Sequence, residues 1–270
     1  MTACAAVASA PNPFPELAPE KLFSLQGQVV VITGAAGGIG GALARGFAAA
    51  GARLVACDVN PRVHELAAQW RQEGMAVDAM TFDLTREDEI AQAFAQITER
   101  HGRVDVLINN AGVIVRTPFL ELKREEWQKV IDIDLTACFL MAQQAARLMV
   151  KQGGGRIIHL SSIMNHVARP NLVPYVSAKG GVSALTRAMA ADLAGTGVTV
   201  NALAPGYTQT EFSQAKDPEF NAFVSGWAPA RRWGQPEDLC GVALLLASGA
   251  GAYINGQTLY VDGGFLAVTR

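Results

Sequence analysis

The chain has 270 residues, of which half are hydrophobic and 17% are charged. This composition is typical of a sheet that helices cover on both faces, and it argues against a disordered chain. A formal net charge of −2 gives no electrostatic attraction for nucleic acid or for an anionic membrane, so we expect neither as a partner.

The N-terminal segment 1–24 contains four prolines but no basic start followed by an apolar run, so it does not resemble a secretion signal. We expect a flexible tail there and one domain over 25–270. No apolar run approaches the roughly 20 residues that span a bilayer, and the four cysteines form no CxxC pair. We therefore expect a cytoplasmic protein without a structural metal or a disulfide framework.

Short β-branched runs alternate with longer helical patterns along the chain. This alternation predicts parallel βαβ crossovers, and therefore an α/β, doubly wound Rossmann fold whose seven-stranded parallel sheet is flanked by helices. The segment 208–232 is the least regular, and we expect a substrate lid there. The expected strands cover 29–33, 53–57, 77–82, 104–108, 156–160, 198–203 and 257–261.

A glycine cluster directly follows the first expected strand and opens a helical pattern. Gly34, Gly38 and Gly40, with Ile39, allow the backbone to turn sharply and approach a pyrophosphate at the helix N-terminus. Without its context the cluster predicts only a tight turn. Asp58 ends the next strand, at the distance of about 20 residues typical of a ribose-binding carboxylate. Because a carboxylate there repels a 2′-phosphate, the sequence predicts NAD rather than NADP.

Two further strand ends carry small or polar residues where a cofactor would cross the edge of the sheet. Asp83 and Leu84 follow the third strand and are expected near the adenine, although Asp83 fits a helix N-cap equally well. After the fourth strand come Asn110, Ala111 and Gly112, which we also expect to contact the cofactor.

A tyrosine and a lysine form the expected proton-transfer pair. Tyr175 and Lys179 are four residues apart in a helical pattern, so their side chains share one face. An ammonium about 4 Å from a phenol favours the phenolate by roughly 4 kcal/mol at an effective dielectric constant of about 20. The spacing alone is common on helix surfaces. Ser162 strengthens the interpretation because it ends the preceding strand, where its hydroxyl can bond the substrate oxygen, although Ser161 is an alternative.

The motifs TGAAGGIG, NNAG, Ser162 with YVSAK, and Pro205-Gly206 occur in this order, and the chain therefore resembles the short-chain dehydrogenase/reductase family. The resemblance implies that Ser162 steadies the substrate oxygen, Tyr175 transfers the proton, and Lys179 assists it and binds the nicotinamide ribose. It also implies direct hydride transfer to or from NAD (NADH) without a catalytic metal, and assembly as a homotetramer. The contacts that it implies to the carboxamide end are Pro205, Gly206, Thr208 and Thr210.

One position departs from the family pattern. The helix before the serine strand usually carries an asparagine that supports a water-mediated proton path to the lysine, and here Asp134 stands in its place. A carboxylate roughly 8 Å from Tyr175 would oppose the phenolate by about 2 kcal/mol. We therefore expect a more alkaline optimum for alcohol oxidation than the same chain with asparagine would have.

The substrate is expected to be a small secondary alcohol or its ketone. Scaffold segments around residues 22–27, 150–155 and 232–239 are similar to the gluconate and deoxygluconate dehydrogenase branch of the family. His166, Phe212 and Trp227 are the expected substrate contacts, whereas His159 is interpreted as a packed core histidine. A 3-oxoacyl carrier reductase and a non-catalytic NAD-binding regulatory protein are the alternatives.

Overall fold

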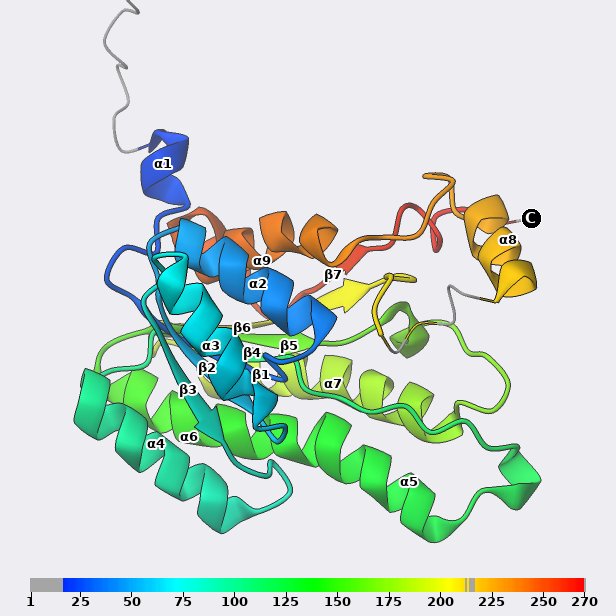
Figure 1. Ribbon diagram of the computed structural model, residues 1–270, viewed down its shortest axis with the longest axis horizontal. Coiled ribbons are helices and arrows are strands. Elements are labelled where there is room, and N and C mark those ends of the chain that lie inside the picture. Colours follow the sequence, from blue (N-terminus) through cyan, green and yellow to red (C-terminus); the bar gives the residue numbers. More distant parts are fainter. Residues whose placement is uncertain (1–16, 212, 214–216, 270) are drawn as a thin grey trace, which may run out of the picture.

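The computed structural model describes residues 17–211, 213 and 217–269. Its strands form one all-parallel sheet in the order β3-β2-β1-β4-β5-β6-β7, which confirms the predicted doubly wound fold (Figure 1). The strands are β1 (Val29–Thr33), β2 (Arg53–Asp58), β3 (Val77–Thr81), β4 (Val106–Asn109), β5 (Gly155–Leu160), β6 (Val198–Pro205) and β7 (Thr258–Val261).

The strand order reverses at β1, and this reversal positions the site. In the middle of β1, Val30 pairs with Leu54 of β2 on one side and with Val106 of β4 on the other. The segments that follow β1 and β4 must therefore diverge beyond the carboxyl ends of the strands, which opens a crevice there.

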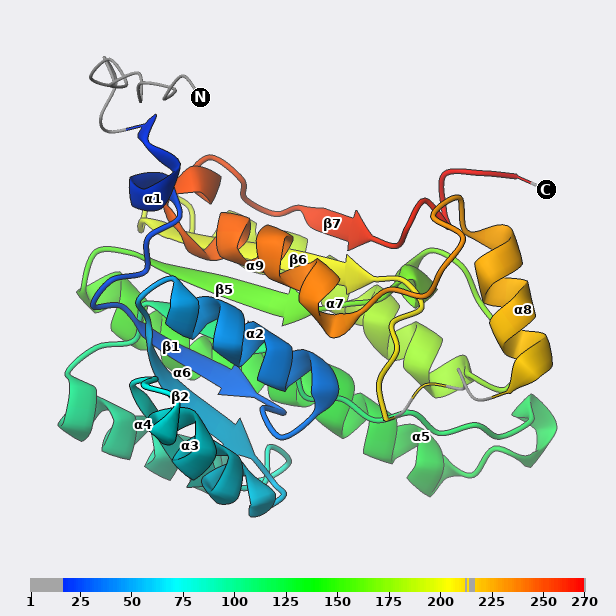
Figure 2. The ribbon, with the colours of Figure 1, turned by 45° about the horizontal axis from the view of Figure 1, so that its top comes forward.

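Helices cover both faces of the sheet (Figures 1 and 2). Phe47 and Trp70 belong to the buried cluster on one face, and Phe94 and Met141 belong to the cluster on the other. Full burial of side chains of this size stabilises the fold by roughly 1.5–3 kcal/mol each. The first face carries α2 (Gly38–Ala49), α3 (Arg62–Gln72) and α9 (Cys240–Ala247), and the second carries α4 (Glu87–His101), α6 (Ala137–Lys151) and α7 (Val173–Asp192).

The long helical stretch before β5 contains a change of helix type. Helix α5 (Arg124–Ile131) continues through a π-helical turn at Asp132–Thr136 into α6. A single π turn inserts one extra residue into the helix, and such turns are frequent at functional sites. Asp134 lies within this turn and is fully buried.

Two short helices lie in segments that were expected to be irregular. Helix α1 (Pro19–Leu22) lies within the expected tail, and α8 (Pro218–Trp227) lies within the expected lid. Asp217 caps α8 by accepting hydrogen bonds from the backbone N–H groups of Glu219 and Phe220. Among the residues described, no helix is both long and apolar enough to cross a bilayer. The 3-10 turns are Phe119–Glu121, Ile163–Asn165, Pro236–Leu239 and Gly249–Gly251.

Candidate active site

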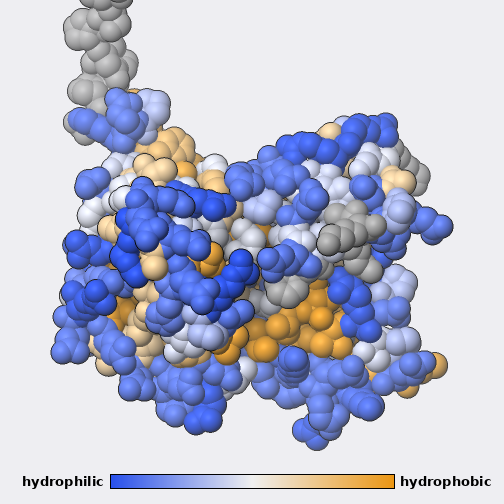
Figure 3. Space-filling model, in the orientation of Figure 1, coloured by the Kyte–Doolittle hydropathy of each residue, from blue (hydrophilic) through white to orange (hydrophobic). Residues whose placement is uncertain are grey.

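A cavity of about 650 Å³ lies in the crevice at the carboxyl ends of the strands. Figure 3 shows this face hollowed between the side that carries α8 and the side that carries α5, with hydrophobic residues gathered in the recess. Ser162, Tyr175, Lys179 and Asp134 line the cavity, as does every residue that the sequence predicted to contact the cofactor. The sequence motifs therefore converge on one place.

The glycine loop after β1 is packed too tightly for side chains. A Cβ on Gly34 would lie 2.8 Å from the Cα of Ala111, and Gly34 itself has a left-handed φ of 65°. A Cβ on Gly40 would collide with the carbonyl oxygen of Gly34. The loop leads into the N-terminus of α2, whose free N–H groups suit a pyrophosphate. These residues therefore fit a dinucleotide cofactor.

Asn110 holds the glycine loop in place. Its side-chain Nδ2 donates to the carbonyl oxygens of Thr33 at 2.9 Å and Gly34 at 3.1 Å. In return, the Thr33 hydroxyl oxygen accepts hydrogen bonds from the backbone N–H groups of Asn110 and Ala111. The asparagine predicted as a cofactor contact thus also fixes the distance between the ends of β1 and β4.

The Asp58 carboxylate lies at the end of β2, beside the glycine loop. Its Oδ2 accepts a hydrogen bond from the backbone N–H of Ala36 at 2.9 Å, and its Oδ1 accepts one from Asn60. Arg62, which also lines this end of the cavity, lies 3.8 Å from the Glu211 carboxylate. This pair is solvent-exposed, whereas Asp58 is held by two backbone N–H groups and is a fixed carboxylate suited to hydroxyl donors.

The third strand end provides a turn rather than a helix cap. Asp83 Oδ1 accepts hydrogen bonds from both the backbone N–H and the hydroxyl of Thr85. The residue that caps α4 is instead Arg86, which makes no side-chain cap bond. Asp83 and Leu84 both line the cavity, so the position stays compatible with an adenine contact.

The two neighbouring serines at the end of β5 have different surroundings. Ser162 Oγ accepts a hydrogen bond from the backbone N–H of Met164, which leaves its hydroxyl hydrogen free to bond a ligand in the cavity. The Oγ of Ser161 instead donates to the carbonyl oxygen of Lys179 and lies 3.1 Å from the hydroxyl of Ser183. The structure thus distinguishes Ser162 from its neighbour.

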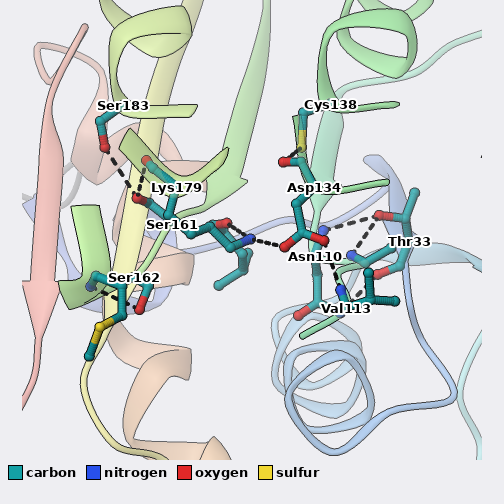
Figure 4. Close-up of polar contacts among 12 residues, drawn as sticks. Thr33, Asn110, Val113, Asp134, Cys138, Ser161, Ser162, Lys179 and Ser183 are labelled. Atoms are coloured by element: carbon teal, nitrogen blue, oxygen red, sulfur yellow. Dashed lines mark hydrogen bonds and ion pairs between the residues drawn. The ribbon is translucent and has the colours of Figure 1, made fainter. Parts of the chain in front are cut away.

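The Lys179 ammonium faces the Asp134 carboxylate (Figure 4). It also lies over the ring of Tyr175. Its Nζ is 3.1 Å from Asp134 Oδ2, donates to the Leu160 carbonyl oxygen at 2.9 Å, and lies 5.4 Å from the centre of the Tyr175 ring. Burial is the largest single influence and lowers the pKa of Lys179, but the charges of Asp134, Tyr175 and Cys138 and the hydrogen bond with Asp134 together outweigh it, so the net pKa is raised. The lysine is therefore held as a cation.

Asp134 is fixed on both sides. Its Oδ1 accepts a hydrogen bond from the backbone N–H of Val113 at 2.7 Å, while Oδ2 faces Lys179 (Figure 4). A Cβ on Gly112 would lie only 2.9 Å from Oδ2, so this glycine is needed beside the carboxylate. The residue that departs from the family pattern thus links the segment after β4 directly to the lysine.

Residues 34–266 match the protein-family model described as "Enoyl-(Acyl carrier protein) reductase". This match covers most of the chain and, with the similar proteins described next, identifies its family. The chain belongs to the short-chain dehydrogenase/reductase family. The resemblance inferred from the motifs is therefore confirmed.

Several relatives of this short-chain dehydrogenase/reductase carry sugar-acid names, as the scaffold segments predicted, although a 37% identical relative from Synechocystis is a 3-oxoacyl-[acyl-carrier-protein] reductase. It is 41% identical to the 5-keto-D-gluconate 5-reductase of Escherichia coli K12, over 91% of this chain and 98% of the relative. It is 39% identical to the gluconate 5-dehydrogenase of Gluconobacter oxydans, over 90% and 96% of the two chains. The crystal structure of a gluconate 5-dehydrogenase from Burkholderia cenocepacia in complex with NADP and tartrate superposes with a TM-score of 0.90, at 40% identity over 93% and 99% of the chains.

The predicted substrate contacts of this dehydrogenase/reductase are not brought together. His166 is exposed, its ring centre is 6.5 Å from that of Tyr260, and it is not part of the cavity lining. Trp227 also lies outside the lining, and its Nε1 donates to the carbonyl oxygen of Phe265. Phe212 lies outside the described residues. Neither His166 nor Trp227 therefore belongs to the wall of the cavity, and Trp227 instead holds the segment that carries Phe265.

Sequence reasoning missed several residues that do line the substrate end. The most notable is Arg169, a cation in the segment that follows Ser162. A basic residue in this segment was the available signal, but its direction depends on contacts with distant parts of the chain. The other missed residues include Ile114, Arg116, Met164, Tyr207, Phe220 and Trp233.

His159 is a core residue, as predicted. It is fully buried, and its Nδ1 lies 3.1 Å from the side-chain nitrogen of Asn109. Burial, with a smaller contribution from the charge of Lys179, lowers the pKa of His159 to about 4. Within the described part of the chain, no group of three or more His, Cys, Asp or Glu residues is arranged to hold a metal ion.

Proposed function

We propose that this protein is an NAD-dependent oxidoreductase that interconverts a secondary alcohol and a ketone on a small sugar acid. The observation that carries the proposal is the convergence of Ser162, Tyr175 and Lys179 with the glycine loop on one cavity. The relatives with sugar-acid names support the substrate class, because their sequences align with nearly the whole chain.

The residues that would hold the nicotinamide dinucleotide follow the cavity from the glycine loop to the lid. A bound cofactor of this kind accepts a hydride from the alcohol carbon or delivers one to the ketone carbon. Its contacts would be Gly34, Gly38, Ile39, Gly40, Asp58, Asp83, Leu84, Asn110, Ala111, Gly112, Tyr175, Lys179, Pro205, Gly206, Thr208 and Thr210.

In the proposed mechanism the chain's own side chains manage the proton. Ser162 donates its free hydroxyl hydrogen to the reacting oxygen and so holds the substrate in place. Tyr175 takes the hydroxyl proton during oxidation and returns it during reduction. The Lys179 ammonium favours the phenolate, and Asp134 moderates this effect because it shares the lysine's charge.

The preference for NAD rests on Asp58. A carboxylate fixed by two backbone N–H groups accepts hydrogen bonds from ribose hydroxyls and repels a 2′-phosphate. The Burkholderia cenocepacia relative was crystallised with NADP, so the preference needs a direct measurement. We expect a higher kcat/KM with NAD than with NADP, and a tenfold or larger preference for the phosphorylated cofactor would contradict the proposal.

The decisive experiment is a substrate panel in both directions with both cofactors. The panel contains gluconate and 5-ketogluconate, neutral polyols and ketoses, and 3-oxoacyl thioesters. Turnover confined to the thioesters would favour the alternative of a 3-oxoacyl carrier reductase. Tyr175→Phe should abolish turnover while NADH binding is retained, whereas binding without turnover of any compound by the wild type would indicate a regulatory protein.

The assembly and the location are part of the proposal. We infer a cytoplasmic homotetramer with one domain over 25–270, in which the segment 208–232 acts as a lid over the substrate. Phe139 and Val150 on α6 are 41% and 42% exposed, which supports contact between subunits on that helix. Sedimentation should give a tetramer, and a monomer at all concentrations would contradict the assembly.

A further inference from the structure

Arg169 is a positively charged cavity residue that the proposed mechanism does not use. It lies in the segment between the 3-10 turn at Ile163–Asn165 and α7, and it lines the same cavity as Ser162 and Tyr175. The side chain is partly buried, so its guanidinium is near both protein atoms and the space that a substrate would fill.

The guanidinium is held by two aromatic residues. Its Cζ lies 4.0 Å from the centre of the Phe220 ring, a cation–π contact with the first half of α8. Burial raises the pKa of Tyr207, and the neighbouring Arg169 opposes this rise through its charge and a side-chain hydrogen bond. Tyr207 and Phe220 also pack edge to face, with ring centres 5.3 Å apart. Arg169 is thus positioned by an aromatic pair whose members contact each other.

No carboxylate among the described cavity residues neutralises this guanidinium. Four acidic side chains line the cavity, and each has other partners: Asp58 with Ala36 and Asn60, Asp83 with Thr85, Asp134 with Lys179, and Glu211 with Arg62. Phe220 and Tyr207 carry no negative charge, so among the described cavity residues the N–H donors of Arg169 have no anionic acceptor. A positive charge fixed beside the reacting groups therefore suits an anion that arrives with the substrate.

We propose that Arg169 binds the carboxylate of the substrate and selects hydroxy- and oxo-carboxylates over neutral polyols and ketoses. This inference rests on the proposed function, because it names the residue that recognises the acid group of a sugar acid. A guanidinium presents a planar fork of donors that matches a carboxylate in a bidentate manner, which an ammonium does not. Arg169 is therefore a specificity-determining residue, distinct from the proton-transfer residues.

The test compares acidic and neutral substrates of the same length in Arg169→Gln and Arg169→Lys. Gluconate and sorbitol are the oxidised pair, and 5-ketogluconate and fructose are the reduced pair. Loss of a charged hydrogen bond corresponds to a factor of roughly 10–100. We expect Arg169→Gln to lower kcat/KM for the acids by about this factor, mainly through KM, and to change the neutral compounds less than about threefold. Arg169→Lys should recover part of the loss.

The matched control is Arg187→Gln. Arg187 is exposed on α7 and does not line the cavity, so its variant loses one positive charge without a change at the site. It should behave as the wild type with every substrate. Equal losses on acids and neutral compounds in Arg169→Gln, or no loss on either, would overturn the inference, as would a larger acid-specific loss in Arg116→Gln.

A binding measurement separates this inference from the proposed function. Gluconate and sorbitol are titrated calorimetrically into the wild type and the Arg169→Gln variant in the presence of NADH, with which an alcohol cannot react. If the wild type turns over no sugar acid, the proposed function fails. Even in that case, the assignment of Arg169 holds if the variant binds gluconate at least about tenfold more weakly than the wild type does and both proteins bind sorbitol equally weakly. Any other result overturns it.

Discussion

The ammonium of Lys179 and the carboxylate of Asp134 form an ion pair inside the protein, with 3.1 Å between Nζ and Oδ2. The two side chains are 5% and 0% exposed, so water screens this interaction very little. The same ammonium faces the ring of Tyr175. One positive charge is therefore shared between a permanent carboxylate partner and a phenol that has to lose and regain a proton.

Removal of the carboxylate charge should move the pH dependence of alcohol oxidation. In Asp134→Asn the ammonium loses its counter-charge and favours the phenolate of Tyr175 more strongly. We expect the pH optimum of oxidation to fall by about one unit relative to the wild type. The measurement is the pH profile of kcat/KM for the best alcohol of the panel. An unchanged profile in a variant that keeps the wild-type melting temperature would show that Asp134 does not tune the reaction.

The ion pair should also be visible in stability. Lys179→Met leaves the buried Asp134 carboxylate without its partner, and loss of one member of a buried pair costs about 3–5 kcal/mol. In the double variant Lys179→Met with Asp134→Asn, no uncompensated charge remains, so at least about 2 kcal/mol should return. Urea unfolding at neutral pH gives both free energies. A double variant as unstable as the sum of the two single changes would mean that the groups are not coupled.

His159 should contribute to acid instability. Its pKa is about 4 in the folded chain and near 6.5 when unfolded, so the unfolded state takes up the proton first as the pH falls. Stability is therefore lost between pH 6.5 and pH 4, by up to about 3 kcal/mol. His159→Gln cannot titrate there, and its unfolding free energy should decline less steeply over this range. Parallel curves for the two proteins would assign the acid loss to other groups.

The glycine loop offers a pair of adjacent substitutions with opposite expected results. A Cβ on Gly40 would meet the Gly34 carbonyl oxygen and lie 2.8 Å from Asn110 Nδ2, so Gly40→Ala must displace the loop. A Cβ on Gly41 would make only an ordinary contact, at 3.7 Å from the Ala35 oxygen. We expect Gly40→Ala to weaken cofactor binding at least about tenfold and Gly41→Ala to bind normally. Cofactor fluorescence titration measures both, and similar affinities would contradict the packing argument.

Much of the fold could be predicted because its signals are local. Each strand is a short β-branched run, and the parallel order follows from the helices between the strands. Helix α8 was missed although Asp217 and Pro218 form an N-cap and first-turn pair at its start. Its apolar residues Phe220, Phe223, Val224 and Trp227 also recur at the i, i+3, i+4 and i+7 spacing of an amphipathic helix, so the signal was present in the sequence.

The site was predictable where a motif fixes the spacing along the chain. Tyr175 and Lys179 share a helix, so their proximity follows from the helical repeat. The contact between Lys179 and Asp134 joins two separate helical segments, so no local pattern indicates that the carboxylate meets the ammonium directly. Arg169 was missed for the same reason, since its partner Phe220 is distant along the chain. His166 shows the converse, because a residue only four positions after Ser162 can still lie outside the cavity lining.

Two of the segments that line the cavity are joined by a backbone hydrogen bond. The segment after β4 and the segment after β5 meet where the backbone N–H of Thr117 donates to the carbonyl oxygen of Asn171, which itself adopts a left-handed φ of 66°. Arg116 is next to one end of this bond, and Arg169 is two residues from the other. The two segments therefore depend on each other for their positions. We expect a chimera that grafts only one of them from a relative to disturb this contact, whereas a chimera that transplants both should keep it.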